Sequence, residues 1–120
     1  MKLILPTLIL FALAIISCRS NRVLVSFKNV SDKDFKELKV FIDSQIYTFN
    51  DLKKNHSTKF VQARYTYPYC PARVITDNDT LDYFFIDFAG ERVYIRGKVR
   101  MEFSIENKRI LKIVTKRLLF

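Results

Sequence analysis

The chain has 120 residues, a formal net charge of +9 and a composition that is 49% hydrophobic. This length suits one domain, and the hydrophobic content argues against a disordered or low-complexity chain. Two cysteines allow at most one disulfide, which excludes a scaffold held by several bridges. One histidine without clustered carboxylates cannot supply the three or four ligands of a metal site.

The chain begins with an apolar segment. After Met1 and Lys2, residues 3–16 contain no charge, and this run is shorter than the roughly 20 residues that span a bilayer. A basic start, an apolar run and a small residue, Ser17, before a cut are typical of a secretory signal peptide. A buried N-terminal helix is the alternative, but without a polar face it would have to be surrounded on all sides.

The end of this segment, Ile15-Ile16-Ser17-Cys18, resembles the lipobox of bacterial lipoproteins. The resemblance implies that the bond between Ser17 and Cys18 is cut, that Cys18 is thioether-linked to diacylglycerol, and that the new amine is acylated. Two or more acyl chains give stable membrane anchoring where one does not. Residues 1–17 would therefore be removed, and residues 18–120 would form a lipid-anchored domain.

The residues after the lipobox bear on location. Removal of Lys2 lowers the net charge of the mature chain from +9 to +8. In lipoprotein terms, Arg19-Ser20 lacks the aspartate that retains such proteins in the inner membrane. It also lacks the acidic run that some Bacteroidota use for surface export. The resemblance therefore implies the periplasmic leaflet of the outer membrane.

From residue 22 onward, apolar and polar residues alternate with a period of two, which predicts β-strands. The expected strands are 22–29, 37–43, 46–49, 57–67, 72–76, 80–88, 92–106 and 109–116. Gly97 marks a bulge or a bend inside the seventh of them. Residues 31–39 could form a short helix capped by Ser31, but a polar loop leading into the next strand is the preferred interpretation.

The clearest strand, 98–106, has apolar residues at alternate positions and polar or charged ones between them. The expected inward residues are Val99, Met101, Phe103 and Ile105. About seven to nine such strands, spaced by about ten residues, predict an all-β fold, either a sandwich or a barrel.

A second resemblance covers residues 25–60, VSFKNVSDKDFKELKVFIDSQIYTFNDLKKNHSTKF. It is similar to the first half of immunoglobulin-like sandwich modules of small exported lipoproteins. In those modules a strand ends in an Asn-x-Ser turn, two strands follow, and a leucine-led polar loop enters the next strand. The resemblance implies one antiparallel, immunoglobulin-like β-sandwich, although the central tryptophan and the bridging cysteine pair of such modules are missing here.

Few residues suggest chemistry. Cys70 would be an unpaired thiol able to pair between chains, but a small buried residue beside Pro71 is the preferred interpretation. His56, with Ser57 beside it and Asp51 nearby, suggests a catalytic triad only superficially, because no nucleophile motif accompanies it. We therefore expect no enzyme activity, no metal and no cofactor.

The carboxylates of Asp77, Asp79 and Asp82 cluster near a turn, and a turn is favoured over a calcium loop. Asp79-Thr80-Leu81 resembles the O-glycosylation acceptor of Bacteroidota, which makes Thr80 a candidate for modification. The N-glycosylation sequons at Asn29, Asn55 and Asn78 would matter only in a eukaryotic host.

Positive charge is the largest deviation from an average composition. Residues 92–117 hold nine basic side chains against Glu102 and Glu106. Within one strand, four of these would share a face with Tyr94, and the candidate stripe consists of Arg92, Arg96, Lys98 and Arg100. Such a stripe would bind an anionic partner, either lipid headgroups or an acidic envelope protein, and an ordinary solvated sheet face is the alternative. A nucleic acid would be attracted too, but is not expected as a partner in the periplasm.

The sequence thus predicts a membrane-anchored periplasmic lipoprotein that serves as a non-enzymatic binding or structural module. One alternative is an accessory subunit of an envelope or secretion assembly, with Cys70 or the basic face at its interface. Another is a periplasmic inhibitor or immunity-type lipoprotein.

Overall fold

The computed structural model describes residues 22–84 and 93–118, which form eight β-strands and no helix. The strands are β1 (Val23–Asn29), β2 (Phe35–Ile42), β3 (Gln45–Leu52), β4 (Val61–Ala63), β5 (Ala72–Ile75), β6 (Thr80–Tyr83), β7 (Gly97–Glu106) and β8 (Ile110–Leu118). The prediction of an all-β fold with seven to nine strands is confirmed. Nothing in the described ranges is a helix of the length and apolarity that crossing a membrane requires.

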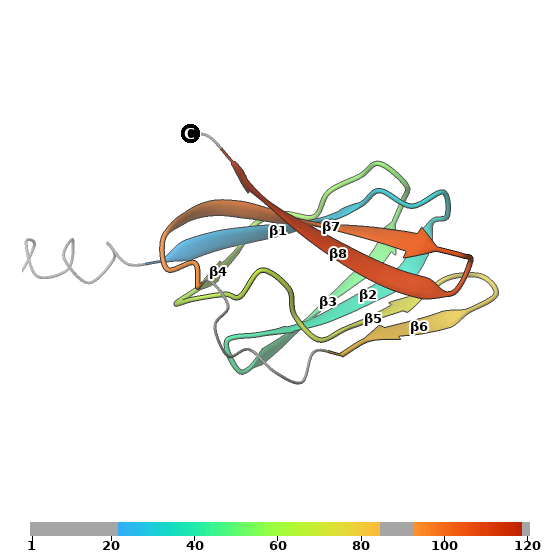
Figure 1. Cartoon of the computed structure of the whole chain (residues 1–120), viewed down its shortest axis with the longest axis horizontal. Coiled ribbons are helices and arrows are strands. Elements are labelled where there is room, and N and C mark those ends of the chain that lie inside the picture. The colour runs from blue at the N-terminus through green and yellow to red at the C-terminus, as the bar shows by residue number, and fades with distance from the viewer. Residues whose placement is uncertain (1–21, 85–92, 119–120) are drawn as a thin grey trace, which may run out of the picture.

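The strands form two four-stranded sheets packed face to face (Figure 1). Sheet A has the order β4-β1-β7-β8, and sheet B has the order β3-β2-β5-β6. The predicted sandwich is therefore correct. The strand order differs from that of the immunoglobulin constant type, in which the first two strands share a sheet, because β1 and β2 lie in opposite sheets here.

The central pair of sheet A is parallel. β1 runs alongside β7 in register from Val23, opposite Gly97, to Asn29, opposite Phe103. The other strand pairs among the described residues are antiparallel. The amino-terminal strand is thus enclosed between β4 and β7 rather than lying at an edge.

The register defines two ends of the sandwich. At one, which we call the proximal end, β1 and β7 begin and β4 and β8 end, because Val23 pairs with both Gly97 and Ala63, and Lys98 pairs with Leu118. The opposite, distal end carries the turn between β7 and β8. In Figure 1 the proximal end of sheet A lies on the left, where the chain enters β1.

Alternation along the strands places the core between the sheets. In β1, β2 and β7 most of the predicted inward residues are almost completely buried: Val23, Val25, Phe27, Leu38, Val40, Ile42, Val99, Met101 and Phe103. Ile105, also predicted to face inward, is only half-buried against this core. The Phe27 ring lies between those of Phe49 and Phe103, with centroids 5.6 and 6.0 Å away. Such tilted aromatic pairs add to the free energy gained from burial.

Two tight turns explain how a chain with only two glycines makes hairpins. Asp43 and Ser44, which join β2 to β3, have φ angles of 50° and 61°. Asn107 and Lys108, between β7 and β8, have φ angles of 50° and 65°. Two successive positive φ angles define the turn that matches the twist of a hairpin, and Asn and Asp tolerate this conformation better than most residues.

A buried asparagine closes the distal end. The Asn29 side chain is fully buried; its Nδ2 donates to the carbonyl oxygens of Lys33 (2.7 Å) and Leu52 (3.0 Å). Its Oδ1 accepts from the backbone N–H of Ser31 (2.9 Å) and from the Ser31 hydroxyl (2.7 Å). Asn29 therefore ties the end of β1 to the loop before β2 and to the end of β3. This loop, residues 31–34, is the predicted polar loop, and the alternative of a helix capped by Ser31 is wrong.

Two expected strands are shorter than predicted. Of residues 57–67 only Val61–Ala63 form β4, because the Thr58 hydroxyl accepts the Phe27 N–H at 3.1 Å in place of a backbone partner, and Arg64 turns away toward Asp43. The strand expected over 92–106 begins at Gly97, whose φ of 89° breaks the extended path. Residues 85–88 of the strand expected over 80–88 lie outside the described residues.

Candidate functional site

The solvent-facing side of sheet A gathers charged side chains from three strands. On β7 they alternate with the buried core residues, and the register places those of β1 and β8 beside them. The charged residues of this face are Lys28 on β1, Lys98, Arg100, Glu102 and Glu106 on β7, and Lys112 and Lys116 on β8. Five cations thus meet two carboxylates among the described residues, and we call this surface the cationic face.

Glu102 lies at the centre of the cationic face. Its carboxylate is bound by Arg100 Nη2 at 3.2 Å and by Lys116 Nζ at 3.0 Å, and its side chain is only 11% exposed. Burial alone would raise the pKa of Glu102, but the hydrogen bond from Lys116 and the charges of Lys116, Arg100 and Lys28 hold it below its ordinary value. Glu102 is therefore an ionised anchor for the cations around it.

The remaining cations differ in how strongly they are held. The Lys98 ammonium lies 5.4 Å from the centre of the Phe60 ring, a cation–π contact that leaves its charge uncompensated. Lys112 reaches Glu106 at 3.1 Å, where both side chains are more than half exposed, so solvent weakens that pair. Arg100 is more enclosed than Lys112 and Lys116, since its side chain is 28% exposed against 54% and 56%. Its Nε is buried without a hydrogen-bond partner among the described residues.

The outer face of sheet B offers a contrast. Register places Glu37, Lys39, Arg73 and Asp82 there. Arg73 Nε binds Asp82 at 2.7 Å, and Lys39 lies 3.7 Å from Glu37. Two cations meet two carboxylates on this face, whereas the cationic face of sheet A keeps an excess of three positive charges. The asymmetry distinguishes the two sides of the sandwich.

The predicted stripe is not one continuous surface. Arg92 lies outside the described residues. Arg96 is exposed in a bend before β7, and Tyr94 pairs with Thr66 and packs against the core instead of facing outward. The expectation that residues 92–100 form a single outward strand is therefore wrong, because Gly97 ends the shared alternation. Lys98 and Arg100 do share the outward face of β7, as expected.

The sequence did not point to Lys28 and Lys116 as parts of this surface. Both alternate with buried residues in their own strands, so their outward direction was predictable. Their position beside Arg100 and Glu102 comes from the pairing of three strands, which no local pattern encodes.

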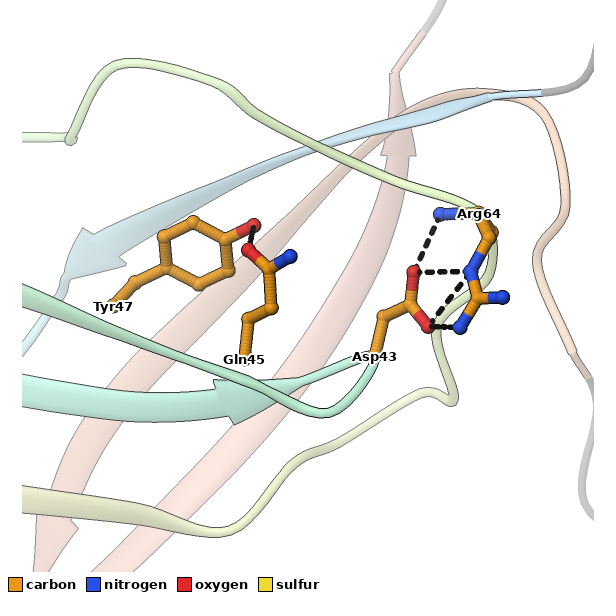
Figure 2. Close-up of polar contacts among 4 residues, drawn as sticks. All are labelled: Asp43, Gln45, Tyr47 and Arg64. Carbon is orange, nitrogen blue, oxygen red and sulfur yellow. Dashed lines mark hydrogen bonds and ion pairs between the residues drawn. The ribbon is translucent and has the colours of Figure 1, made fainter.

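A second charged site joins the two sheets at the proximal end (Figure 2). Asp43, in the turn between β2 and β3, accepts hydrogen bonds from Arg64 Nη2 at 2.6 Å, from Nε at 3.0 and 3.1 Å, and from the Arg64 backbone N–H at 3.0 Å. The hydrogen bonds from the Arg64 side chain and backbone lower the pKa of Asp43 from 3.8 to about 2. Figure 2 also shows Tyr47 donating to Gln45 at 3.1 Å beside this turn.

Cys70 is a buried residue of the core, as preferred from the sequence. It is 3% exposed, its thiol lies 3.7 Å from the Met101 sulfur, and burial raises its pKa to about 12. A thiol with so high a pKa carries almost no thiolate at neutral pH and is unreactive. The suggestion that Cys70 lies at an interface with another subunit is therefore wrong.

The residues considered for catalysis do not form a catalytic unit. Asp51, His56 and Ser57 line the same surface hollow of ≈ 410 Å³ beside the end of β3, but all three are exposed. Within the described residues, no hydrogen bond joins their side chains. A triad needs such bonds to orient its base.

The carboxylates considered for calcium are each directed to a different cation. Asp77 lies 3.1 Å from Lys36, Asp79 lies 3.8 Å from Lys33, and Asp82 binds Arg73. In residues 22–84 and 93–118, no group of three or more His, Cys, Asp or Glu side chains could hold a metal. The turn favoured from the sequence is correct, since Thr76 and Asp79 close it with a 2.9 Å backbone hydrogen bond.

The candidate modification sites differ in accessibility. Thr80 is exposed at the start of β6, and its O-glycosylation stays a prediction. Among the sequons, Asn55 and Asn78 are exposed, whereas the fully buried Asn29 could not carry a glycan. Ser17 and Cys18, the predicted cleavage and lipidation residues, lie outside the described residues.

Comparison with known proteins adds information on the fold alone. No protein-family model and no curated protein matches the sequence. Among solved structures, a protein from Eubacterium rectale determined by NMR is similar, with a TM-score of 0.58 and 15% sequence identity. The match covers 83% of this chain and 92% of that protein. The sandwich described here is therefore shared with a solved structure.

Proposed function

We propose that this protein is a lipid-anchored, non-enzymatic binding module of the bacterial envelope, held at the periplasmic leaflet of the outer membrane through acyl chains on Cys18. In this proposal the cationic face takes an anionic partner, either an acidic envelope protein or lipid headgroups. The proposed activity is binding rather than catalysis.

The observation that carries this proposal is the uncompensated charge of the cationic face. Its cations lie on hydrogen-bonded strands of sheet A, and ion pairs with Glu102 position Arg100 and Lys116. Preorganised charge of one sign attracts an oppositely charged partner and fixes the orientation of docking. A merely solvated face would be expected to resemble sheet B, in which each outward cation has a carboxylate beside it.

The accessory-subunit alternative remains compatible with the cationic face. The version that uses Cys70 is excluded by the burial of that residue. An accessory subunit that docks through the cationic face is a special case of the binding module proposed here, with an acidic subunit of an envelope or secretion assembly as its partner.

The anchor is tested by producing the full chain in a Gram-negative host and measuring the intact mass of the protein extracted from membranes. The expected result is a chain that begins at Cys18 and carries acyl mass on that residue. A Cys18→Ser variant should lack this mass and lose its membrane association. A wild-type protein that keeps residues 1–17 and carries no acyl mass would contradict the proposed anchor.

Binding by the cationic face is tested with polyglutamate as an acidic polypeptide probe. A triple variant, Lys28→Gln, Lys98→Gln and Lys112→Gln, should lose most of the binding, which should also weaken with added salt. The matched control removes three lysines from the side of sheet B: Lys33→Gln, Lys36→Gln and Lys39→Gln. If both variants lose binding equally, the net charge alone explains binding and the cationic face has no special role.

A further inference from the structure

The proximal end of the sandwich combines exposed apolar side chains with arginines. Tyr94 pairs with Thr66 through backbone hydrogen bonds of 2.8 and 2.9 Å and packs against the core. Because side chains alternate along an extended segment, Val93 and Ile95 on either side of it point outward, and they are 43% and 52% exposed. Arg96 follows them directly and is exposed.

More cations surround these apolar residues. Arg22 precedes β1, Arg117 lies one residue before the end of β8, and both are exposed. Asp43, in the turn at this end, is bound by Arg64 at 2.6 Å. Among the described residues, no ion pair joins Arg22, Arg96 or Arg117 to a carboxylate, and only Arg22 lies near enough to Asp43 for its charge to help lower the pKa of that group.

The short segment between Cys18 and β1 limits how far the proximal end can lie from the membrane. Four residues, 19–22, separate Cys18 from Val23. Five Cα–Cα steps span at most about 18 Å when the chain is fully extended. With Cys18 acylated, as in the function proposed above, the proximal end is held within that distance of the bilayer surface.

From these observations we infer that the proximal end is a membrane-docking surface. Val93 and Ile95 enter the interfacial layer of the bilayer, and Arg22, Arg96 and Arg117 contact anionic lipid headgroups. Exposed apolar side chains flanked by basic ones are the combination that holds proteins in a membrane interface. This inference rests on the proposed function for the anchor and decides between its two partners. The sandwich stands on its proximal end, so the cationic face of sheet A lies at the side of the domain, where an acidic protein can reach it and the lipid surface does not cover it.

The absence of tryptophan from the sequence makes the inference directly measurable. Ile95→Trp places a single tryptophan, which can be excited apart from the tyrosines, at the docking surface. Ile110→Trp is the matched control, because Ile110 is 53% exposed, against 52% for Ile95, and opens β8 at the distal end. Since β8 has 9 residues, the two reporters are separated by roughly 25–30 Å along the sheet. Val114 is 43% exposed in the wild-type protein. The variant Val114→Trp therefore reports from the middle of the cationic face.

The acylated full-length variants are reconstituted into vesicles of phosphatidylcholine and phosphatidylglycerol whose acyl chains are brominated. The expected result is a blue-shifted, strongly quenched emission for Ile95→Trp and an unquenched emission for Ile110→Trp and Val114→Trp. Quenching of Val114→Trp as strong as that of Ile95→Trp would mean that the domain lies flat on the cationic face, and would overturn the inference. Equal quenching of Ile95→Trp and Ile110→Trp would overturn it as well.

The contribution of the arginines is tested in the Ile95→Trp background. Arg22→Gln, Arg96→Gln and Arg117→Gln together should reduce quenching to the level seen with phosphatidylcholine alone, because each cation near an anionic surface favours contact about fivefold. The matched control changes three distal cations: Lys53→Gln, Lys54→Gln and Arg109→Gln. Equal loss of quenching in both variants would show that net charge, and not the proximal end, governs the contact.

Failure of this inference is distinguishable from failure of the proposed anchor. The intact mass and co-sedimentation with vesicles report acylation, whereas tryptophan quenching reports docking. An acylated, vesicle-bound protein whose Ile95→Trp emission is unquenched would overturn docking and leave the anchor standing. An unacylated protein whose Ile95→Trp emission is quenched by anionic vesicles would overturn the anchor and support docking.

Discussion

Replacing Asn29 by alanine should destabilise this protein more than its small change in volume suggests. The substitution removes the donor to the Lys33 and Leu52 carbonyls and the acceptor of the Ser31 N–H and hydroxyl. Ser31 and Leu52 are 8% and 6% exposed, so water replaces the lost partners poorly there. The Lys33 carbonyl keeps a contact with the Ser31 hydroxyl at 2.9 Å.

Each buried polar group left without a partner costs about 1–3 kcal/mol. With two such groups, the N–H of Ser31 and the carbonyl of Leu52, the free energy of unfolding should fall by about 2–6 kcal/mol. In a domain of this size each kcal/mol corresponds to roughly 4–8 °C in melting temperature. Denaturant titration of the chain from residue 19 onward, followed by circular dichroism, measures the loss.

Asn50→Ala is the matched control, because Asn50 is an exposed asparagine on the neighbouring strand β3. Its free energy of unfolding should stay within about 0.5 kcal/mol of the wild type. If Asn29→Ala were equally harmless, the hydrogen bonds that tie β1 to β3 would not stabilise the distal end, and the reasoning above would be refuted.

Three further predictions concern stability and reactivity. Phe103→Ala should lower the free energy of unfolding by about 3–5 kcal/mol. Ile110→Ala should lower it by far less, because Phe103 is buried and Ile110 is exposed. Similar losses for the two variants in denaturant titrations would contradict the assignment of Phe103 to the core. Since the folded pKa of Asp43 is about 2 against an ordinary 3.8, the stability that this carboxylate contributes is present above pH 4 and is lost as the pH falls toward 2. In thermal melts between pH 2 and 4, the melting temperature of Asp43→Asn should therefore fall less steeply with decreasing pH than that of the wild type. Equal slopes for the two proteins would show that Asp43 does not contribute this pH dependence. The Cys70 thiol, with a pKa of about 12, should resist alkylation at neutral pH until the protein is unfolded in guanidinium, so rapid labelling of the folded protein would argue against its burial.

The strands were predictable from the sequence because one face of each sheet packs on the other sheet. Alternation in β1 and β7 therefore identified most of their core residues correctly, although Ile105 is only half-buried and Glu102, on the opposite face, is buried. Alternation does not reveal whether a strand has a partner, which is why residues 57–60 and 93–96 were expected to be strands. In the first stretch, the Thr58 hydroxyl accepts a hydrogen bond from the Phe27 backbone N–H in place of regular strand pairing. In the second, Tyr94 satisfies its backbone against Thr66 outside the sheets.

The candidate site was predictable only in part for the same reason. The outward direction of Lys98 and Arg100 follows from the period of β7, and the structure places both on one face. Arg96 does not share the outward face of β7 because Gly97, with its positive φ, bends the chain between them. The sequence predicted a bulge or a bend at Gly97, but it did not indicate which side chains the bend would separate. Lys28 joins the site through a parallel pairing between the first strand and the seventh, and a long-range pairing of this kind leaves no local signal.

That parallel pairing also has a consequence for how the protein folds. β1 is enclosed in the centre of sheet A, yet its longest partner, β7, is separated from it by most of the domain sequence. Non-local strand pairing has a large entropy cost of loop closure and slows folding. Sheet B can begin from its local hairpins, whereas sheet A cannot be completed until the last quarter of the chain is present. A fragment that ends before Gly97 would leave β1 with only the three-residue β4 as a partner, so we expect incomplete chains of this protein to remain unfolded and prone to aggregation.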